Sequence, residues 1–399
     1  MPERIDVAIV GAGPFGLSTG AFLRGVHARV FGPVLETWSE VMPPEMILRS
    51  SWEDATIASP GEVGSTDRWI EATGEEKPAR VSLQTFLRYG EWFREQLVRE
   101  HDPSRVELVA RENGGYRVGT SSGDEVRARH VVVAVGTLPF AYAPAPFAHA
   151  VDGDRVRFAF QRGAAGAGAQ PGERIVIVGA GQSALESAAS AARAGAAVEI
   201  VVRSHVHWFA DREPERERGP LGRMLYDLAY PVVGFGPPPL NRIVLAPDLF
   251  ASLPLRLRNA LNGRLLRAGG APWLRDEVES LVAITEGRVV VSLERTGDEL
   301  RLGLDDGSVR EADRVLLATG FRFDVARLDF FAPELRGRIR IRHGWPVIDR
   351  NLRSVTEPGI SFAGYPAEGT FGPATRFVRG TRLAGPRIAA ALGLAPALS

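Results

Sequence analysis

Residues 5–16 read Ile5-Asp6-Val7-Ala8-Ile9-Val10-Gly11-Ala12-Gly13-Pro14-Phe15-Gly16, an apolar run followed at once by a glycine-rich turn. The run predicts a buried strand, and a G-x-G-x-x-G turn between a strand and a helix is typical of a dinucleotide-binding βαβ unit. In such a turn Gly11 would permit the tight bend, Gly13 would let the backbone approach a pyrophosphate, and Gly16 would allow close helix–strand packing. Pro14 suits the first helical position, where its missing N–H costs no hydrogen bond. We therefore expect a pyrophosphate cofactor beside this turn, with Phe15 among its contacts.

The same plan returns later in the chain. Residues 175–184 read Ile175-Val176-Ile177-Val178-Gly179-Ala180-Gly181-Gln182-Ser183-Ala184, with alanine in the third-glycine place, where it is permitted. A single glycine turn can be an ordinary turn, but two copies in the same context favour two nucleotide-binding domains. The sequence therefore predicts an α/β protein with two Rossmann-like domains, and we expect the second cofactor to contact Gly179, Gly181, Gln182 and Ser183.

The residue after the second strand of each unit bears on which nucleotide is bound. Arg203 follows the apolar run 198–202, and a cation at this place accepts a 2′-phosphate, which favours NADPH. The alternative is a surface arginine that merely ends a strand. In the first unit the strand ends at Phe31-Gly32 without the usual acidic residue, and Glu36 is the nearest substitute. We place Glu36 and the neighbouring Trp38 among the contacts of the first cofactor.

The composition narrows the classes of partner. The chain has 399 residues, 45% of them hydrophobic, and its 48 basic and 48 acidic residues give a formal net charge of zero. Such a chain has no overall field that would attract nucleic acid or an anionic membrane. The apolar stretch 131–151 is interrupted by Gly136 and three prolines, so we expect no membrane span there. The N-terminus shows no basic segment followed by an apolar one, which predicts a cytoplasmic protein.

The remaining segments give a coarse map of the chain. We expect a helix over 81–98, hairpin-like strands over 106–130 with turns at 113–115 and 123–124, and a helix over 240–267. Strands are expected over 289–304, and two buried strands that end in glycine over 131–136 and 315–320. The run 211–218 is charged and predicts a solvated loop, whereas the glycine- and alanine-rich run 161–172 predicts a linker between domains.

Taken together, these motifs resemble the class B flavin monooxygenase group, which comprises flavin-containing, Baeyer–Villiger and amine N-hydroxylating enzymes. The resemblance rests on both glycine turns, on Arg203, and on Ala318-Thr319-Gly320-Phe321, which is similar to the family's ATG segment. It covers most of the chain and implies an NAD(P)H domain inserted into an FAD domain. Residues 1–140 and 315–399 would form the FAD domain, 141–172 a linker, and 173–314 the NAD(P)H domain.

The resemblance also implies an activity. Enzymes of this group reduce FAD with NADPH, retain NADP+, and form a C4a-(hydro)peroxyflavin that delivers one oxygen atom of O2 to a small organic substrate. The expected cofactors are thus FAD and NADPH, and the partners a small-molecule substrate and O2, with a homodimer left open. On the same basis Gly136, Thr319, Gly320 and Phe371 join the expected cofactor contacts.

Two segments are expected near the flavin ring by the same resemblance, namely 46–52 and 369–377. From these we select Arg49, Ser50 and Arg376 as candidate catalytic residues. Arg49 would stabilise an anion by its charge, although an arginine close to Glu53 and Asp54 in sequence is often only part of an ion pair.

Some features depart from the family pattern or exclude other readings. The family linker signature Phe-x-Gly-x-x-x-His is absent between Phe140 and Gly172, and Phe158-Ala159-Phe160 stands where its histidine is expected. The chain has no cysteine, which excludes the disulfide reductases of the same architecture because they need a cysteine pair. Its seven histidines show no metal-ligand grouping, so no metal is expected. The alternatives are a reductase that passes electrons from NAD(P)H through flavin to another acceptor, and a non-catalytic redox sensor.

Overall fold

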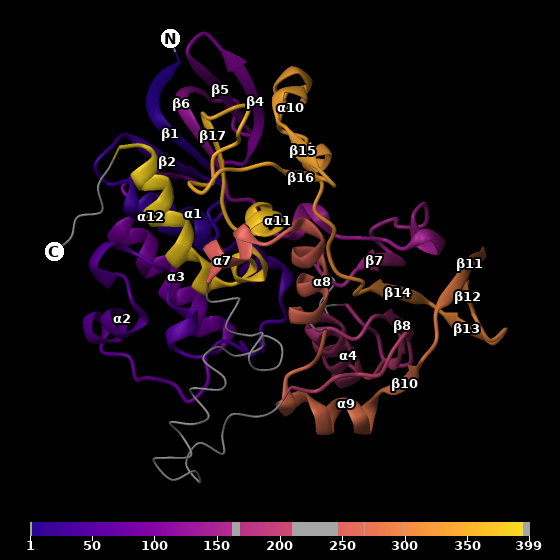
Figure 1. Ribbon diagram of the computed structural model, residues 1–399. Coiled ribbons are helices and arrows are strands. Elements are labelled where there is room, and N and C mark those ends of the chain that lie inside the picture. The colour runs from indigo at the N-terminus through magenta and orange to yellow at the C-terminus, as the bar shows by residue number, and fades with distance from the viewer. Residues whose placement is uncertain (1, 162–167, 210–245, 267, 298, 394–399) are drawn as a thin grey trace.

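A computed structural model describes residues 2–161, 168–209, 246–266, 268–297 and 299–393. Figure 1 shows two α/β bodies side by side, the larger of which contains the N-terminus and the C-terminal helix. The larger body is built on one seven-stranded sheet with the order β3-β2-β1-β6-β5-β4, in which β17 also pairs with β6. Its strands are β1 (Glu3–Val10), β2 (Ala28–Phe31), β3 (His101–Asp102), β4 (Val106–Glu112), β5 (Gly115–Thr120), β6 (Glu125–Val133) and β17 (Ile360–Phe362).

The centre of this sheet is parallel and brings three strand ends together. Val10 at the end of β1 lies opposite Phe31 of β2 and Val133 of β6. β1 is buried over its last residues, as expected of a strand covered on both faces. Helix α1 (Pro14–Phe22) packs on β1 and β2, α3 (Leu83–Leu97) and α12 (Thr381–Ala391) pack on α1, and α2 (Thr66–Thr73) packs on α3. The carboxyl ends of β1, β2 and β6 therefore meet at one edge, where a parallel α/β sheet binds ligands.

The smaller body contains a five-stranded parallel sheet of order β10-β9-β8-β14-β7. Its strands are β7 (Val156–Phe158), β8 (Arg174–Val178), β9 (Ala197–Val202), β10 (Ala283–Glu286) and β14 (Arg314–Leu317). Helices α4 (Gln182–Arg193) and α9 (Arg275–Leu281) pack together on it, with the buried small side chains of α4 facing the sheet. A separate antiparallel sheet is formed by β11 (Val290–Thr296), β12 (Glu299–Leu304) and β13 (Val309–Ala312).

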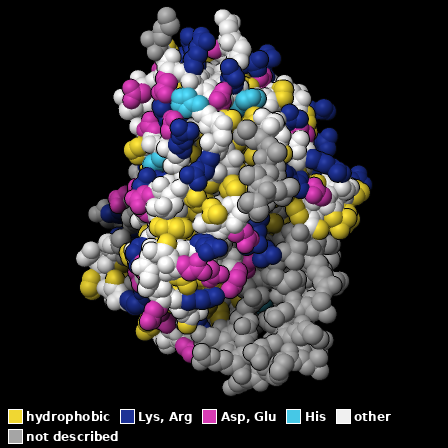
Figure 2. All heavy atoms as spheres, turned by 90° about the vertical axis from the view of Figure 1, so that its left-hand side faces the viewer, with side chains coloured by type: hydrophobic (Ala, Val, Ile, Leu, Met, Phe, Trp, Pro, Cys, Tyr) yellow, Lys and Arg dark blue, Asp and Glu magenta, His cyan; other side chains and the backbone are white. Residues whose placement is uncertain are grey.

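The remaining described elements lie mainly between and beside the two sheets (Figure 1). They are α7 (Pro247–Ser252), α8 (Leu255–Leu265), α10 (Pro333–Arg338), β15 (Ile341–Arg342), β16 (Trp345–Pro346), α11 (Glu368–Phe371) and the π-helical turn η1 (Thr37–Val41). No helix among the described residues combines the length and apolar character needed to cross a bilayer. On the face drawn in Figure 2, acidic and basic side chains are interspersed, in keeping with a net charge of zero.

Most of the elements expected from the sequence are confirmed. The helix over 81–98 is α3, the hairpins over 106–130 are β4 to β6, and the expected turns join them. The larger sheet takes strands from 3–133 and 360–362, and the smaller sheet takes strands from 156–317, so the second nucleotide fold is inserted into the first. The described part of 240–267 forms two helices, because Pro254 stands between them. The charged run 211–218 lies outside the described residues.

The expected domain limits differ from the strand pairing at two places. The limit at residue 315 falls inside β14, which pairs with β8 and β7 and thus belongs to the smaller sheet. The expected linker 141–172 contains β7, an edge strand of that same sheet. An apolar strand can pair in either sheet, and only the hydrogen-bonding register decides which one it joins.

Candidate functional site

The first glycine turn is shaped by close backbone contacts. Gly11 has φ +107°, its N–H donates to the Phe31 carbonyl over 2.8 Å, and a Cβ there would lie 2.5 Å from the Ala134 carbonyl oxygen. A Cβ at Gly16 would lie only 1.8 Å from the Gly11 carbonyl oxygen. Both positions therefore exclude a side chain for reasons of packing alone. The turn holds the N-terminus of α1 against the ends of β1, β2 and β6.

Gly13 differs from its two neighbours in the motif. Its backbone is extended, with φ −75° and ψ −178°, and it is the N-cap of α1, which begins at Pro14. No protein atom lies within 4 Å of a Cβ added at Gly13, and Gly13 lines a cavity. The protein itself would tolerate a side chain here. The space in front of a helix N-terminus is where a pyrophosphate binds, so the geometry fits the role expected for Gly13.

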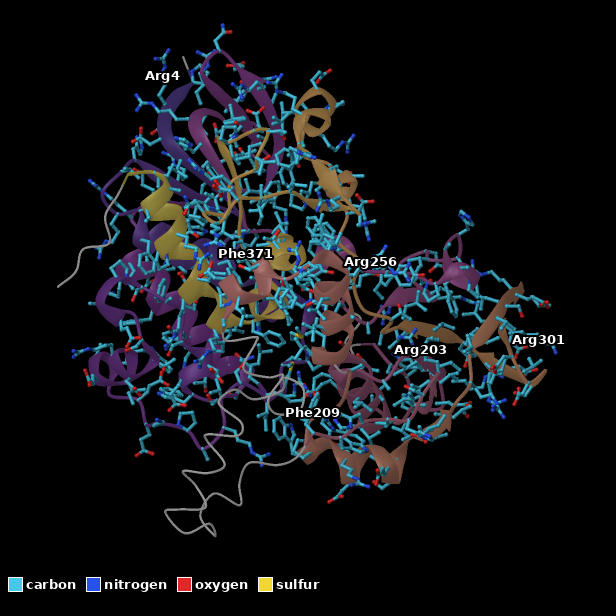
Figure 3. All side chains as sticks on the ribbon, in the orientation of Figure 1. Arg4, Arg203, Phe209, Arg256, Arg301 and Phe371 are labelled. Atoms are coloured by element: carbon cyan, nitrogen blue, oxygen red, sulfur yellow. The ribbon has the colours of Figure 1, made fainter. Side chains whose placement is uncertain are left out.

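The second turn repeats this arrangement contact for contact. The Gly179 N–H donates to the Val201 carbonyl over 3.0 Å, and a Cβ at Gly179 would lie 2.4 Å from the Ala318 carbonyl oxygen. Gly181 is extended and has no atom within 4 Å of an added Cβ, as at Gly13. Arg203 is exposed two residues beyond Val201, in the smaller body of Figure 3. The second turn thus has the shape of a second dinucleotide-phosphate site, with a cation at the end of the adjoining strand.

The first turn and the N-terminus of α4, which follows the second turn, line one cavity of about 700 Å³ between the two bodies. The residues expected from the sequence that line it are Gly11, Gly13, Pro14, Phe15, Glu36, Trp38, Arg49, Ser50, Gly136, Gln182, Ser183 and Arg376. Glu36 forms an ion pair with Arg105 at 2.5 Å, and Arg105 also lines the cavity. The tertiary structure therefore brings the first turn, the 46–52 segment, the 369–377 segment and the N-terminus of α4 to one space.

Other expected contacts lie outside the cavity wall, namely Gly16, Gly179, Gly181, Arg203, Thr319, Gly320 and Phe371. The Thr319 hydroxyl donates to the Tyr142 carbonyl, and the Gly320 carbonyl accepts from the Tyr142 N–H over 3.0 Å. These two residues therefore join the chain segments that cross between the bodies. Phe371, which was expected to contact the cofactor, is 1% exposed in the core and packs against Arg387. Its neighbours Arg376 and Phe377 occupy the wall instead.

Phe160 occupies the place in sequence where the family histidine was expected. Its ring lies 5.3 Å from the ring of Phe321, and both rings line the cavity. Phe321 follows the Ala318-Thr319-Gly320 segment, so this segment contributes to the site through its aromatic neighbour. An apolar ring pair offers no proton and no charged hydrogen bond at this point of the wall.

Arg49 presents a cation to the cavity. Glu53 pairs with Lys77 and Asp54 pairs with Arg379, so the two carboxylates near it in sequence are engaged elsewhere. The Arg49 guanidinium instead lies over the ring of Phe209 at 4.4 Å. No carboxylate among the described residues pairs with Arg49. Burial lowers the pKa of Arg49 to about 10, which leaves it charged at neutral pH.

Arg376 has a different environment. Its guanidinium forms an ion pair with Glu368, which is 2% exposed, and lies 4.6 Å from the centre of the Tyr365 ring. Burial alone would lower the pKa of Arg376, but the facing carboxylate more than offsets this and raises it. Burial also raises the pKa of Tyr365 to about 12. The charge of Arg376 at the cavity wall is therefore compensated by the Glu368 carboxylate.

One carboxyl group in the wall was missed by the sequence analysis. Glu186 is on α4, lines the cavity and is 4% exposed. Gln182 Nε2 donates to Glu186 Oε1 over 2.6 Å. Burial raises the pKa of Glu186 from its ordinary value of 4.5 to about 7. Glu186 could have been predicted from its spacing in the sequence. It follows Gln182, which was already expected at the site, by four residues, and residues four apart share one face of a helix.

We expect Glu186→Gln to change the pH dependence of stability. Because the pKa of Glu186 is raised in the folded state, the wild-type protein gains stability from the protonated carboxyl at low pH and loses it as the pH rises from about 4.5 through about 7. The loss is up to about 3 kcal/mol. Glutamine stays neutral, so the unfolding free energy of the variant relative to wild type should rise by that amount between pH 4.5 and 8.5.

Urea unfolding at the two pH values measures this difference. Glu334→Gln, at an exposed carboxyl on α10, is the matched control and should show no comparable change. Equal pH profiles for wild type and Glu186→Gln would contradict the assignment of a raised pKa.

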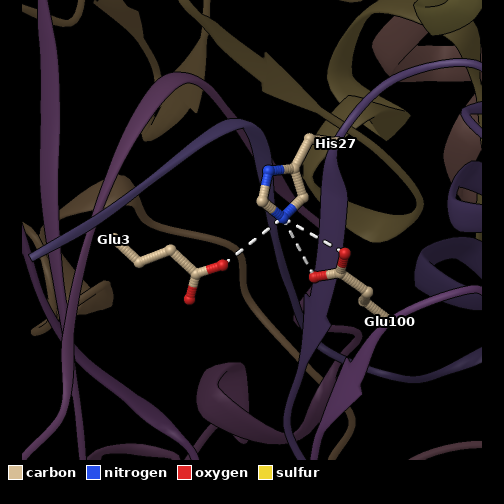
Figure 4. A group of neighbouring side chains, drawn as sticks. All are labelled: Glu3, His27 and Glu100. Carbon is tan, nitrogen blue, oxygen red and sulfur yellow. Dashed lines mark hydrogen bonds and ion pairs between the residues drawn. The ribbon is translucent and has the colours of Figure 1, made fainter.

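One group of potential metal ligands lies away from the cavity. Glu3, His27 and Glu100 bring their ligand atoms within 4.8 Å of one another (Figure 4). Arg29 Nη2 lies 2.9 Å from Glu3 and 3.1 Å from Glu100, so a guanidinium already pairs with both carboxylates. The arrangement is that of a half-exposed ion-pair network at the edge of the larger sheet.

The two turns and two sheets define a protein with two dinucleotide-binding folds facing one cavity. The family model described as pyridine nucleotide-disulphide oxidoreductase matches residues 8–218, more than half of the chain. The chain belongs to this family. No curated protein matches the sequence.

Solved structures with the same fold cover nearly the whole chain. An ornithine N-hydroxylase from Kutzneria sp. 744, described with reduced FAD, NADP+ and L-ornithine, has a TM-score of 0.74 at 18% identity, over 98% of this chain and 99% of its own. An ornithine hydroxylase from Pseudomonas aeruginosa has a TM-score of 0.75 at 18% identity, over 98% of each chain. A bacillithiol disulfide reductase from Staphylococcus aureus has a TM-score of 0.64 at 17% identity, over 98% of each chain. The resemblance to class B flavin monooxygenases is thus confirmed in the fold.

Proposed function

We propose that this protein is an FAD-dependent, NADPH-using monooxygenase that inserts one oxygen atom of O2 into a small organic substrate. The observation that carries the proposal is the repeated geometry of the two glycine turns, together with one cavity that is lined by Gly13 of the first turn and by Gln182 and Ser183 directly after the second. Two dinucleotide cofactors held at these turns would both reach this cavity. That arrangement suits electron transfer from one cofactor to the other.

FAD would be held by the first turn. Gly13 leaves room for the pyrophosphate, the N-terminus of α1 faces it, and Glu36 and Trp38 lie farther along the wall. Glu36 is paired with Arg105, so a ribose hydroxyl would meet an acceptor that is already fixed in position. The Kutzneria structure described with FAD shares this fold over nearly its full length, which supports FAD as the cofactor.

NADPH would be held by the second turn. Gly181 leaves the matching space at the N-terminus of α4, and Gln182 and Ser183 line the cavity beyond it. Arg203 supplies the exposed cation expected to meet a 2′-phosphate. The NADP+ named for the Kutzneria structure supports the choice of the phosphorylated nucleotide.

The proposed chemistry requires a reduced flavin to activate O2. The protein contributes the cavity in which this would occur and the charged side chains in its wall. Arg49 is a cation in the wall with no carboxylate partner among the described residues, so its charge is available to stabilise an anion formed in the cavity. Ser50 lies next to it in the wall. Arg376 is neutralised by Glu368 and is better suited to fix the wall than to stabilise new charge. Arg49 is therefore the first candidate for a catalytic role.

Two observations weigh against the alternative activities. The absence of cysteine argues against disulfide reduction, although one structural neighbour is a disulfide reductase. Two neighbours with TM-scores of 0.74 and 0.75 are an ornithine N-hydroxylase and an ornithine hydroxylase. A reductase that passes electrons to another acceptor remains the second candidate, since Phe158-Ala159-Phe160 stands where the family histidine was expected.

The experiment that tests the proposal follows oxygen and NADPH together. We expect the purified protein to be yellow, to release FAD, and to oxidise NADPH only when O2 is present. Product formed under 18O2 from a screen of small amines, ketones and sulfides should contain one labelled oxygen. Because the family histidine is missing, we also expect part of the NADPH to be consumed with release of hydrogen peroxide. Product without the label, or NADPH oxidation that continues with another acceptor in the absence of O2, would favour the reductase.

A further inference from the structure

The buried carboxyl of Glu186 is not used by the proposed chemistry. It lies one helical turn beyond Gln182 on α4, in the wall of the cavity that Gln182 and Ser183 also line. Gln182 Oε1 accepts from the Ala271 N–H over 2.8 Å, which fixes the side-chain amide so that its Nε2 donates to Glu186. The described residues thus give Glu186 one hydrogen-bond partner, and that partner is a neutral amide.

The charges around Glu186 do not compensate an ionised carboxylate. The cation that acts on Glu186 is Arg193 of the same helix, which already pairs with Glu277 of α9 at 2.5 Å and with Glu45 of the larger body at 2.7 Å. One cation and two carboxylates leave a net charge of −1 facing Glu186 from these three elements. A buried carboxyl with a neutral partner and a surplus of negative charge nearby favours its protonated form.

A dinucleotide at the second turn would add further negative charge. Its pyrophosphate would sit at the N-terminus of α4, four to five residues from Glu186, and would disfavour ionisation of the carboxyl still more. By linkage, a ligand that raises the proton affinity of a group binds together with a proton and binds less tightly as the pH rises.

We propose that binding of a nicotinamide dinucleotide at the second turn takes up a proton, and that Glu186 is the residue that holds it. The inference rests on the proposed function in one respect, that the second turn binds NADP(H). No bond is made or broken other than the O–H bond of the Glu186 carboxyl, and the proton comes from the solvent. The protein then binds the nucleotide most tightly when the cavity carboxyl is neutral.

Calorimetric titration of the FAD-loaded protein with NADP+ tests this directly. Repeating the titration at pH 7.5 in buffers with different ionisation enthalpies gives the number of protons taken up for each nucleotide bound. We expect a substantial fraction of one proton for wild type, and a Kd that rises by up to roughly tenfold between pH 6.5 and 8.5. Glu186→Gln keeps an oxygen acceptor for Gln182 Nε2. For this variant we expect the proton uptake of wild type to be lost, and the Kd to rise less between pH 6.5 and 8.5 than it does in wild type.

Two comparisons identify the group that titrates. The 2′-phosphate of NADP+ has its own pKa near 6, as phosphate monoesters do, and the difference between wild type and Glu186→Gln cancels its contribution. His205 lies two residues beyond Arg203 and pairs with Glu286 at 2.7 Å. His205→Gln is therefore the control that tests whether the proton is taken up by this histidine and not by Glu186. We expect His205→Gln to take up as many protons on NADP+ binding as wild type, and thus more than Glu186→Gln.

Infrared difference spectra of the bound and free protein give a second readout. The carbonyl band of a protonated carboxyl should grow on NADP+ binding in wild type and be missing in Glu186→Gln. Binding of NADP+ with the same proton uptake in wild type and Glu186→Gln would overturn the inference while leaving the proposed function in place. Uptake that disappears only in His205→Gln would also overturn it. Failure of NADP+ to bind the yellow wild-type protein would overturn both.

Discussion

A Gly13→Val protein is expected to purify without FAD and without colour. The added side chain would point into the space that the structure leaves open at the N-terminus of α1, where the proposed pyrophosphate lies. The backbone at Gly13 is extended, with φ −75°, so valine meets no strain there, and no protein atom lies within 4 Å of its Cβ. The variant should therefore fold and lose only the cofactor. The measurement is the flavin absorbance per protein after purification and after incubation with excess FAD.

Gly181→Val is the matched variant, because Gly181 has the same extended backbone and the same open space at the second turn. It should stay yellow, while reduction of its flavin by NADPH should be lost. Gly337→Val, at an exposed site in α10 with no atom near an added Cβ, controls for the effect of valine itself. Full FAD occupancy in Gly13→Val would refute the assignment of the first turn. Loss of FAD in both turn variants would point to general damage.

Replacement of Arg203 is expected to weaken the use of NADPH and to spare NADH. A charge-assisted hydrogen bond contributes about 1.5–3 kcal/mol, so Arg203→Ala should lower kcat/KM for flavin reduction by NADPH roughly 10- to 150-fold. NADH carries no 2′-phosphate and should lose little. Arg203 is exposed beside the second turn, so its removal should not disturb packing. Stopped-flow reduction of the flavin by each nucleotide measures both values.

Arg301→Ala provides the control for loss of a positive charge. Arg301 is exposed on β12, at the outer edge of the smaller body and far from Arg203 in Figure 3. It should leave the preference between NADPH and NADH unchanged. An equal loss with both nucleotides in Arg203→Ala, or no loss with NADPH, would identify Arg203 as an ordinary surface residue.

The site could be predicted only in part. The parts that could be predicted, the two glycine turns, have one property in common. A glycine turn acts through the backbone of consecutive residues, so its geometry follows from a short stretch of sequence. Both turns accordingly have the tight bend expected of them, and the two bends make equivalent close contacts, with Ala134 in one and Ala318 in the other. The place of the Phe371 side chain outside the cavity wall could not be predicted, because a local turn, here α11 and the residues after it, decides which of several neighbouring side chains faces the cavity.

The strands of each sheet could also be predicted from the sequence, but the strands with which they pair could not. The runs 131–136 and 315–320 look alike in sequence, yet β6 pairs in the larger sheet and β14 in the smaller one. The pairing depends on contacts between segments far apart in the chain, such as β14 with β7 and β8. No periodicity within either run encodes that choice.

The sequence by itself determined the two nucleotide-binding units and the lack of cysteine chemistry, because each depends on local pattern or composition. The insertion of one unit in the other was expected from the family resemblance. Only the tertiary structure decided that Arg376 has a carboxylate partner while Arg49 has none among the described residues, and that Glu186 is a buried acid in the same wall. The physical reason is that charge and proton affinity depend on burial and on the groups that face a side chain, and these come from different parts of the chain.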